Sequence, residues 1–127
     1  MIVNTPISLG ELIDKISILR IKKNNIMDQK KLKHIDQELT LLDRVLSDSV
    51  SDKKINEYLN ELVKVNALLW KIEDKIRECE KKNKFDEYFI NLARSVYKTN
   101  DKRAKIKLEI NNFFGSELVE VKSYEKY

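Results

Sequence analysis

Three polar residues interrupt an apolar seam in the C-terminal half of the sequence. Asn100, Arg103 and Lys107 occupy the heptad positions between Val96 and Ile110. Burying such groups without partners costs on the order of several kcal/mol, so they must be solvated, paired or bound to a ligand. Two cations one helical turn apart suit a carboxylate or phosphate group. This polar stripe is therefore a candidate site for a small anionic ligand.

The polar stripe has three possible interpretations. In the first, the helix breaks at Thr99-Asn100-Asp101, and a new helix buries Ile106, Ile110 and Phe113. In the second, the polar residues form an internal network that fixes the register of the helices. In the third, the stripe faces a solvent-filled groove that forms a functional pocket, because water or an anion relieves the repulsion between the two cations.

Acidic residues that could oppose the stripe lie near the N-terminus. Glu11 and Asp14 share one face of the first expected helix, so they can form an opposing wall if that helix folds back. The segment Lys122-Ser123-Tyr124 would then form the rim of the groove.

A further pairing follows from the hairpin turn expected near residues 83–84. Positions at equal distances from the turn of an antiparallel hairpin are opposite each other, which predicts an ion pair between Glu73 and Arg94. The same rule places Trp70 opposite Tyr97. The candidate ligand-binding residues are thus Glu11, Asp14, Glu73, Arg94, Tyr97, Asn100, Arg103 and Lys107.

Caps and apolar periodicity predict the elements that carry these residues. Pro6 keeps the first residues extended, and Ser8 with Glu11 matches a capping box before an apolar run. Leucine and isoleucine then recur at alternating spacings of three and four. These signals predict four helices: from about Leu9 to about Asn24, from Asp28 to the Ser47–Asp52 stretch, from about Lys53 to Lys82, and from near Asp86 to Phe114 before Gly115. Outside the helices, Met1–Ile7 should be extended, and Leu118–Tyr124 should form an extended strap or a short strand.

The sequence therefore predicts an all-α fold. No Gly or Pro occurs between Gly10 and Gly115, and we expect more than about two-thirds helix. The third and fourth helices should form a long antiparallel hairpin, with two further helices and extended N- and C-terminal segments. Residues 1–127 are expected to form a single helical domain. The third helix has a wider apolar face than one neighbour can cover, which predicts a homodimer or larger assembly.

Composition limits the function classes. The 25 basic and 21 acidic residues give a net charge of +4, and their mixing along the chain argues against a nucleic-acid interface. Cys79 continues an apolar seam and is the only cysteine, so no internal disulfide can form. A single cysteine fits a reducing, cytoplasmic setting. No leader or membrane-spanning run is evident, so we expect no membrane insertion. The lone His34 suits the surface, and no metal-ligand spacing or phosphate loop is present, so we expect neither metal nor cofactor.

Four segments of this sequence resemble a bacterial and phage family of helical domains of unknown function. They span nearly the whole chain: GELxDKI and LWxIEDxIR within Ile7–Ile16 and Leu69–Arg77, and ARSVYxTNDxRA and GSxLVExKSY within Ala93–Ala104 and Gly115–Tyr124. The resemblance implies domains that occur alone or beside sugar-transferring enzymes, and hence a place in cell-surface glycan assembly.

Three functions are then open, and no catalytic motif selects an enzyme. The leading hypothesis is a non-enzymatic protein-interaction or oligomerisation module, accessory to cell-surface polysaccharide synthesis. The alternative is a protein that binds, or an enzyme that acts on, a small anionic or phosphorylated ligand resembling a sugar nucleotide. The third, nucleic-acid binding, would use the basic residues Lys98, Lys102, Arg103, Lys105 and Lys107.

Overall fold

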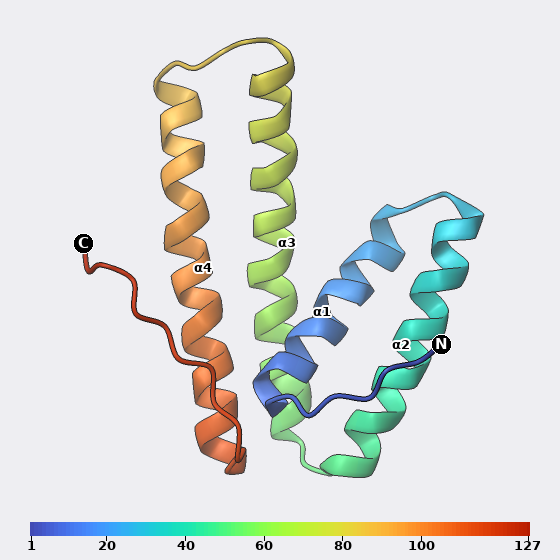
Figure 1. The fold of residues 1–127 in the computed structure, drawn as a ribbon. Helices are drawn as coiled ribbons and strands as arrows, with labels where there is room; N and C mark the ends of the chain where they lie inside the picture. Colours follow the sequence, from blue (N-terminus) through green and yellow to red (C-terminus); the bar gives the residue numbers. More distant parts are fainter.

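Four α-helices make up 74% of the chain in the computed structural model, which covers residues 1–127 and contains no strand. This confirms the all-α prediction. In Figure 1 the last two helices run antiparallel and side by side as the predicted long hairpin. The helices are α1 (Leu9–Asn25), α2 (Gln29–Ser49), α3 (Lys54–Lys81) and α4 (Glu87–Phe114).

Local capping determines where the helices begin and end. The Ser8 hydroxyl accepts from the Glu11 amide at 3.1 Å, and Asp28 and Asp86 cap α2 and α4 in the same way. Gly115 ends α4 in the left-handed conformation, with φ of 66°, which glycine adopts without steric cost. The predicted boundaries are therefore close to the observed ones. The capping box is half formed, because the Glu11 carboxylate binds Lys107 rather than the backbone at Ser8.

The structure decides two local features that the sequence left open: where α2 ends within the Ser47–Asp52 stretch, and whether the C-terminal tail is an extended strap or a strand. α2 continues through Ser47 and Ser49, whose hydroxyls donate to the carbonyl oxygens of Arg44 and Val45 within the helix. The chain after Gly115 forms no strand, and it runs beside α4 as an extended tail (Figure 1). A lone extended segment without a neighbouring strand has no ladder partner.

α4 is a single uninterrupted helix, which excludes the first interpretation of the polar stripe, a break at Thr99-Asn100-Asp101. Thr99 is buried, and Arg103 and Lys107 in the following turns bind carboxylates of α1. Because these partners satisfy the polar stripe, the helix continues through it without a kink.

α1 lies at the centre of the fold. It packs against α2 on one side and against α3 and α4 on the other, and the α1–α2 pair diverges from the α3–α4 hairpin toward their free ends (Figure 1). Ile13, Ile16, Leu62 and Ile110 from these elements are fully buried. α1 is therefore apolar on most of its circumference, as expected for a helix with three neighbours.

The wide apolar face of α3 is covered within the chain. α1 and α4 both pack on it, and together they bury Leu59, Leu62 and Ile72, while Leu68 remains exposed. The width of this face therefore does not by itself require a second copy, and the oligomeric state stays a prediction. None of the four helices combines the length and apolarity needed to cross a bilayer.

Gly10 allows the start of α1 to approach α4 closely. A Cβ atom at this position would lie 2.5 Å from the Lys107 carbonyl oxygen and 3.0 Å from Oδ1 of Asn111. The Gly10 amide donates to that same Asn111 oxygen at 2.7 Å. Only glycine fits this contact without moving one of the two helices.

Replacing Gly10 with alanine should destabilise the protein by about 1–3 kcal/mol, because overpacking against backbone outweighs the higher helix propensity of alanine. Urea unfolding measures this difference. Gly115→Ala is the comparison: it meets no atom within 4 Å and should cost about 1 kcal/mol through its positive φ alone. A Gly10→Ala protein as stable as the parent would contradict the close approach.

Candidate functional site

A fully buried carboxylate joins three helices. Asp14 lies on α1 between core isoleucines, with none of its surface exposed. Nε of Arg103 donates to Oδ1 of Asp14 at 3.0 Å, and Nη2 of Arg103 donates to Oδ2. Asn66 of α3 donates to Asp14 at 2.8 Å and to Ser17 at 2.8 Å. The two-point contact with Arg103 matches the geometry in which a guanidinium binds a carboxylate most strongly.

A second cation lies one turn further along α4. Lys107 is 7% exposed, and its Nζ lies 2.7 Å from Glu11, 2.8 Å from Glu120 and 3.9 Å from Asp14. Burial of the ammonium lowers its pKa, but the hydrogen bonds to Glu11 and Glu120 and the negative charges of Asp14 and Glu11 together outweigh burial, so the pKa lies above its ordinary value. Lys107 is therefore a stable cation that ties α1 and the C-terminal tail to α4.

The beginning of α1 is bound to the end of α4 by uncharged groups as well. The amide of Leu9 donates to the Ser116 hydroxyl at 3.3 Å, next to the bond from Gly10 to Asn111. These amides have no acceptor within their own helix, because the first turn of a helix leaves its N–H groups unpaired. Side chains of α4 and the tail thus complete the cap of α1.

These contacts distinguish the three interpretations of the polar stripe. Arg103 and Lys107 belong to an internal network, and no buried side-chain polar atom in the protein lacks a partner. The expectation that the whole stripe faces a solvent-filled groove is wrong for Lys107, which three carboxylates enclose. Arg103 differs, because 28% of its side chain is exposed. Its outer edge, with Asn100, borders an open cleft.

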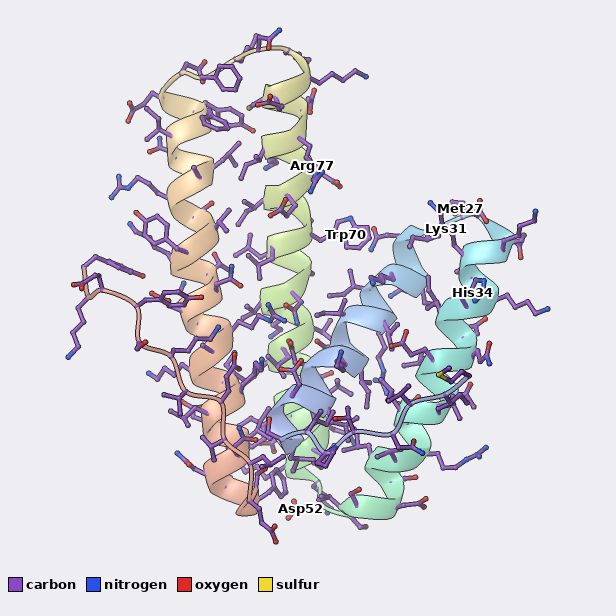
Figure 2. The ribbon with its side chains drawn as sticks, viewed as in Figure 1. Met27, Lys31, His34, Asp52, Trp70 and Arg77 are labelled. Carbon is purple, nitrogen blue, oxygen red and sulfur yellow. The ribbon has the colours of Figure 1, made fainter.

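This cleft, which we call the α1–α3 cleft, lies where α1 diverges from the α3–α4 hairpin and has a volume of about 410 Å³. Its floor is formed by Asn66, Asn100 and Arg103, so the polar network and the cleft share residues. Figure 2 shows Trp70 projecting from α3 toward the C-terminal end of α1, across the cleft. The walls are completed by Ile18, Ile21, Lys22, Leu69, Glu73 and Asp74.

The structure brings together most of the predicted site residues, in two layers. Glu11, Asp14 and Lys107 lie inside the network together with Arg103. Glu73, Asn100 and Arg103 line the α1–α3 cleft. Arg94 and Tyr97 belong to neither set.

The predicted ion pair of Glu73 with Arg94 is wrong. The Glu73 carboxylate lies 3.5 Å from Nε of Arg77, one turn along its own helix, and it makes no ion pair with Arg94. Both charges are exposed, so a neighbour at i+4 satisfies Glu73 without crossing the hairpin. Trp70 likewise does not face Tyr97, since the two side chains line different hollows.

Tyr97 lines a second groove, between α4 and the C-terminal tail, with a volume of about 520 Å³. Its ring contacts Tyr127 edge to face, with centroids 5.2 Å apart, and the Tyr127 hydroxyl donates to Asp101. The predicted rim segment lies here, because Lys122 and Tyr124 line the groove and Lys122 pairs with Glu120 at 3.2 Å. The tail thus borders α4 on the side away from the α1–α3 cleft.

Sequence reasoning missed three buried polar residues of the network: Ser17, Asn66 and Asn111. Asn66 follows Leu62 by four residues and precedes Leu69 by three, so it interrupts the apolar face of α3. That is the same signal that identified Asn100 and Arg103. No group of three or more His, Cys, Asp or Glu side chains could hold a metal ion.

Comparison with known proteins adds a family and no function. A family model described as "Family of unknown function (DUF6165)" matches residues 3–127. No curated protein and no solved structure matches this chain.

Replacing Asp14 with asparagine should lower the free energy of unfolding by about 3 kcal/mol or more, because it leaves the guanidinium of Arg103 without its counter-ion. Arg103→Leu should lower the free energy of unfolding by a similar amount, because it leaves the buried Asp14 carboxylate without its counter-ion. Chemical denaturation measures both. The matched control is Asp36→Asn, which removes a half-exposed pair with Lys23 at 2.9 Å and should cost at most about 1 kcal/mol. Equal, small losses for all three variants would mean that the buried pair is not structural.

Acid should release the C-terminal tail from α4. The hydrogen bond from Lys107 holds the pKa of Glu120 below its ordinary value of 4.5. A lowered pKa in the docked state means that docking is fully stabilised well above pH 4.5 and weakens as the pH falls below 4.5 through the lowered pKa. NMR signals of the tail amides should move to free-chain positions over this range. Glu120→Gln should abolish most of this pH dependence, whereas Glu125→Gln, which removes a tail carboxylate without an ion pair, should preserve it.

Proposed function

Because the chain belongs to a family of unknown function, DUF6165, we propose its role from the geometry of the molecule: a binding module whose α1–α3 cleft takes a small polar ligand that contains a ring. One observation carries this proposal. Asn66 of α3 and Arg103 of α4 are oriented by buried Asp14 of α1, and both line the floor of the same cleft. Binding sites of small molecules typically combine such fixed polar groups with apolar walls.

The size and lining of the cleft support a ligand about as large as one or two sugar rings. A volume of about 410 Å³ lies within the range of small-molecule sites, roughly 300–1,000 Å³. Trp70 offers a flat apolar face at one wall, with Leu69 on the same helix. Asn100 and the exposed edge of Arg103 offer hydrogen bonds at the floor, and Glu73 and Asp74 offer acceptors at the side. An aromatic face beside several donors and acceptors suits a polyhydroxylated ring, whose own surface is apolar on its faces and polar around its edge.

The charge balance of the cleft favours an uncharged sugar moiety over a phosphate. Asp14 neutralises Arg103 from beneath, and Glu73 and Asp74 outnumber the remaining cation, Lys22. A phosphate would therefore meet about as much negative as positive potential. The sequence led to the alternative hypothesis that Arg103 and Lys107 bind an anionic ligand. Because carboxylates offset both cations, we propose a neutral sugar for the cleft in place of an anion.

The polar floor also favours binding over catalysis. Both carboxylate oxygens of Asp14 accept hydrogen bonds from Arg103, and one also accepts from Asn66, so Asp14 is fully occupied as a positioning group. A general base would need a free lone pair within reach of the substrate. A sugar-binding cleft would suit a non-enzymatic accessory of cell-surface polysaccharide synthesis, which is the role we propose. The buried, unpaired Cys79 fits a reducing, cytoplasmic setting.

Trp70 is the only tryptophan, so its fluorescence reports directly on the α1–α3 cleft. We expect neutral mono- or disaccharides from a panel to change its emission and raise the melting temperature. Trp70→Ala should weaken binding about tenfold or more, as followed by calorimetry, because it removes the apolar wall. Leu68→Ala, two residues earlier and exposed, is the control and should bind normally. A stronger response to inorganic phosphate than to any sugar would overturn the proposed ligand class.

A second candidate function is oligomerisation, and exposed apolar side chains at the turn between α3 and α4 favour it. Phe85, Tyr88 and Ile90 are each about half exposed, and Phe85 contacts Phe89 edge to face at 5.2 Å. Charged residues of both signs flank them in the sequence, and Lys82 pairs with Glu78 at 2.7 Å. A surface of mixed sign around an apolar centre is self-complementary across a two-fold axis, so we propose that a second copy of the chain covers it.

Sedimentation velocity tests the proposed dimer. We expect the parent to be dimeric at high micromolar concentration, and Phe85→Glu with Tyr88→Glu should produce a monomer with unchanged helicity, because two charges would be buried at the interface. Leu41→Glu on the outer face of α2 is the control and should leave the assembly intact. A parent that is strictly monomeric at these concentrations would exclude this function.

A further inference from the structure

The positive charge of the protein is concentrated at one end of one hairpin. Residues 20–34, which join α1 to α2, contain six of the 25 basic residues and one of the 21 acidic residues, so this segment carries a net charge of +5. The remaining 19 basic and 20 acidic residues give −1 for the rest of the chain. We expected basic and acidic residues to be evenly mixed along the chain. They are not, because this segment carries the net positive charge. We call residues 20–34 the basic turn.

Most lysines of the basic turn are free to bind an external anion. Lys22, Lys30, Lys31 and Lys33 form no ion pair, and the last three are exposed. Only Arg20 and Lys23 form ion pairs, with Asp43 at 3.8 Å and with Asp36 at 2.9 Å. These unpaired positive charges lie close together at the turn between α1 and α2, so they repel one another. Binding of a polyanionic partner would reduce this repulsion.

The basic turn also carries an apolar side chain at its tip. Met27 is 85% exposed, and Figure 2 shows it beside Lys31 at the free end of the α1–α2 pair, with His34 further along α2. Asp28, the one acid of the segment, accepts from the amides of Lys30 and Lys31 and caps α2. The tip therefore presents an exposed methionine together with exposed lysines, and it stands apart from the turn of the α3–α4 hairpin because the two helix pairs diverge (Figure 1).

We propose that the basic turn docks the protein on the surface of a membrane that contains anionic phospholipids. Each lysine near such a surface contributes about 1 kcal/mol, which is about fivefold in affinity. Met27 would enter the headgroup layer while the lysines bind phosphates around it, an arrangement that peripheral membrane proteins use. No transmembrane segment is needed for this contact, and none of the helices provides one.

The observations favour a lipid surface over a nucleic acid. Nucleic-acid sites track a backbone along a groove, and they rely on arginine forks and aromatic stacking. The basic turn has lysine in five of its six cationic positions, contains no aromatic residue and is a blunt tip rather than a groove. Of the five basic residues of α4 that a nucleic-acid site would use, Arg103 and Lys107 are bound to carboxylates inside the protein, which leaves Lys98, Lys102 and Lys105 exposed.

Vesicle sedimentation with the full chain tests this proposal. We expect binding to vesicles of phosphatidylcholine with about one-third phosphatidylglycerol, weak or no binding to pure phosphatidylcholine, and loss of binding as salt is raised. The triple variant Lys30→Ala, Lys31→Ala and Lys33→Ala should bind about a hundredfold more weakly. Met27→Ser should weaken binding by a smaller factor at every salt concentration, because its contribution is apolar.

The matched control removes three exposed lysines of α4, as Lys98→Ala, Lys102→Ala and Lys105→Ala, and lowers the net charge by the same amount. It should retain most of the vesicle binding. Equal losses for the two triple variants would overturn the proposal, because they would mean attraction by net charge alone. So would binding to inorganic phosphate or to soluble glycerol phosphate as strong as to vesicles, or tighter binding of duplex DNA through Lys30, Lys31 and Lys33 at the same salt concentration. Circular dichroism confirms that each variant is folded.

Discussion

The ion pair between Asp14 and Arg103 is the interaction on which the rest of this structure depends. It places a carboxylate of α1 in the interior, between Ile13 and Ile16, and that carboxylate is satisfied only when α3 and α4 supply Asn66 and Arg103 from their own sides. A buried pair of this kind adds little net stability over apolar residues, because desolvation offsets most of the attraction. What it adds is specificity, since any rotation of α1 would leave an unpaired charge in the core.

The network extends this specificity to both ends of the chain. Lys107 binds Glu11 in the first turn of α1 and Glu120 in the C-terminal tail, so one ammonium connects segments that are more than 100 residues apart in the sequence. Gly10 permits the same end of α1 to lie against the α4 backbone. The α3–α4 hairpin, the central helix α1 and the tail are therefore held in one arrangement by polar contacts that apolar packing alone would not define.

The divergence of the two helix pairs produces the surfaces to which we assign functions. Near the network the helices are in close contact; beyond Arg103 and Asn66 they separate, and the α1–α3 cleft opens above a floor whose polar groups are already oriented. Preorganised donors bind a ligand without the entropic cost of ordering side chains. At the far end of the α1–α2 pair lies the basic turn, so a cleft between the two helix pairs and a surface for anionic lipids at the tip of one pair share only Lys22.

The sequence by itself determined the helices, their caps and the presence of an unusual polar stripe, because these depend on interactions within about four residues. Ser8, Asp28, Asp86 and Gly115 mark helix ends through bonds to nearby backbone, and Arg103 and Lys107 stood out against the apolar period of their own helix. Only the tertiary structure decided the partners. Because Glu73 and Arg94 lie at equal distances from the hairpin turn, we predicted that they pair. Distance from the turn gives the position of a residue along its helix axis, but it does not give the rotation of the helix about that axis. The two side chains therefore do not meet. Asp14 meets Arg103 because α1, 89 residues earlier in the chain, turns that one face toward α4, and this rotation depends on burying Ile13, Ile16 and their neighbours against three helices at once.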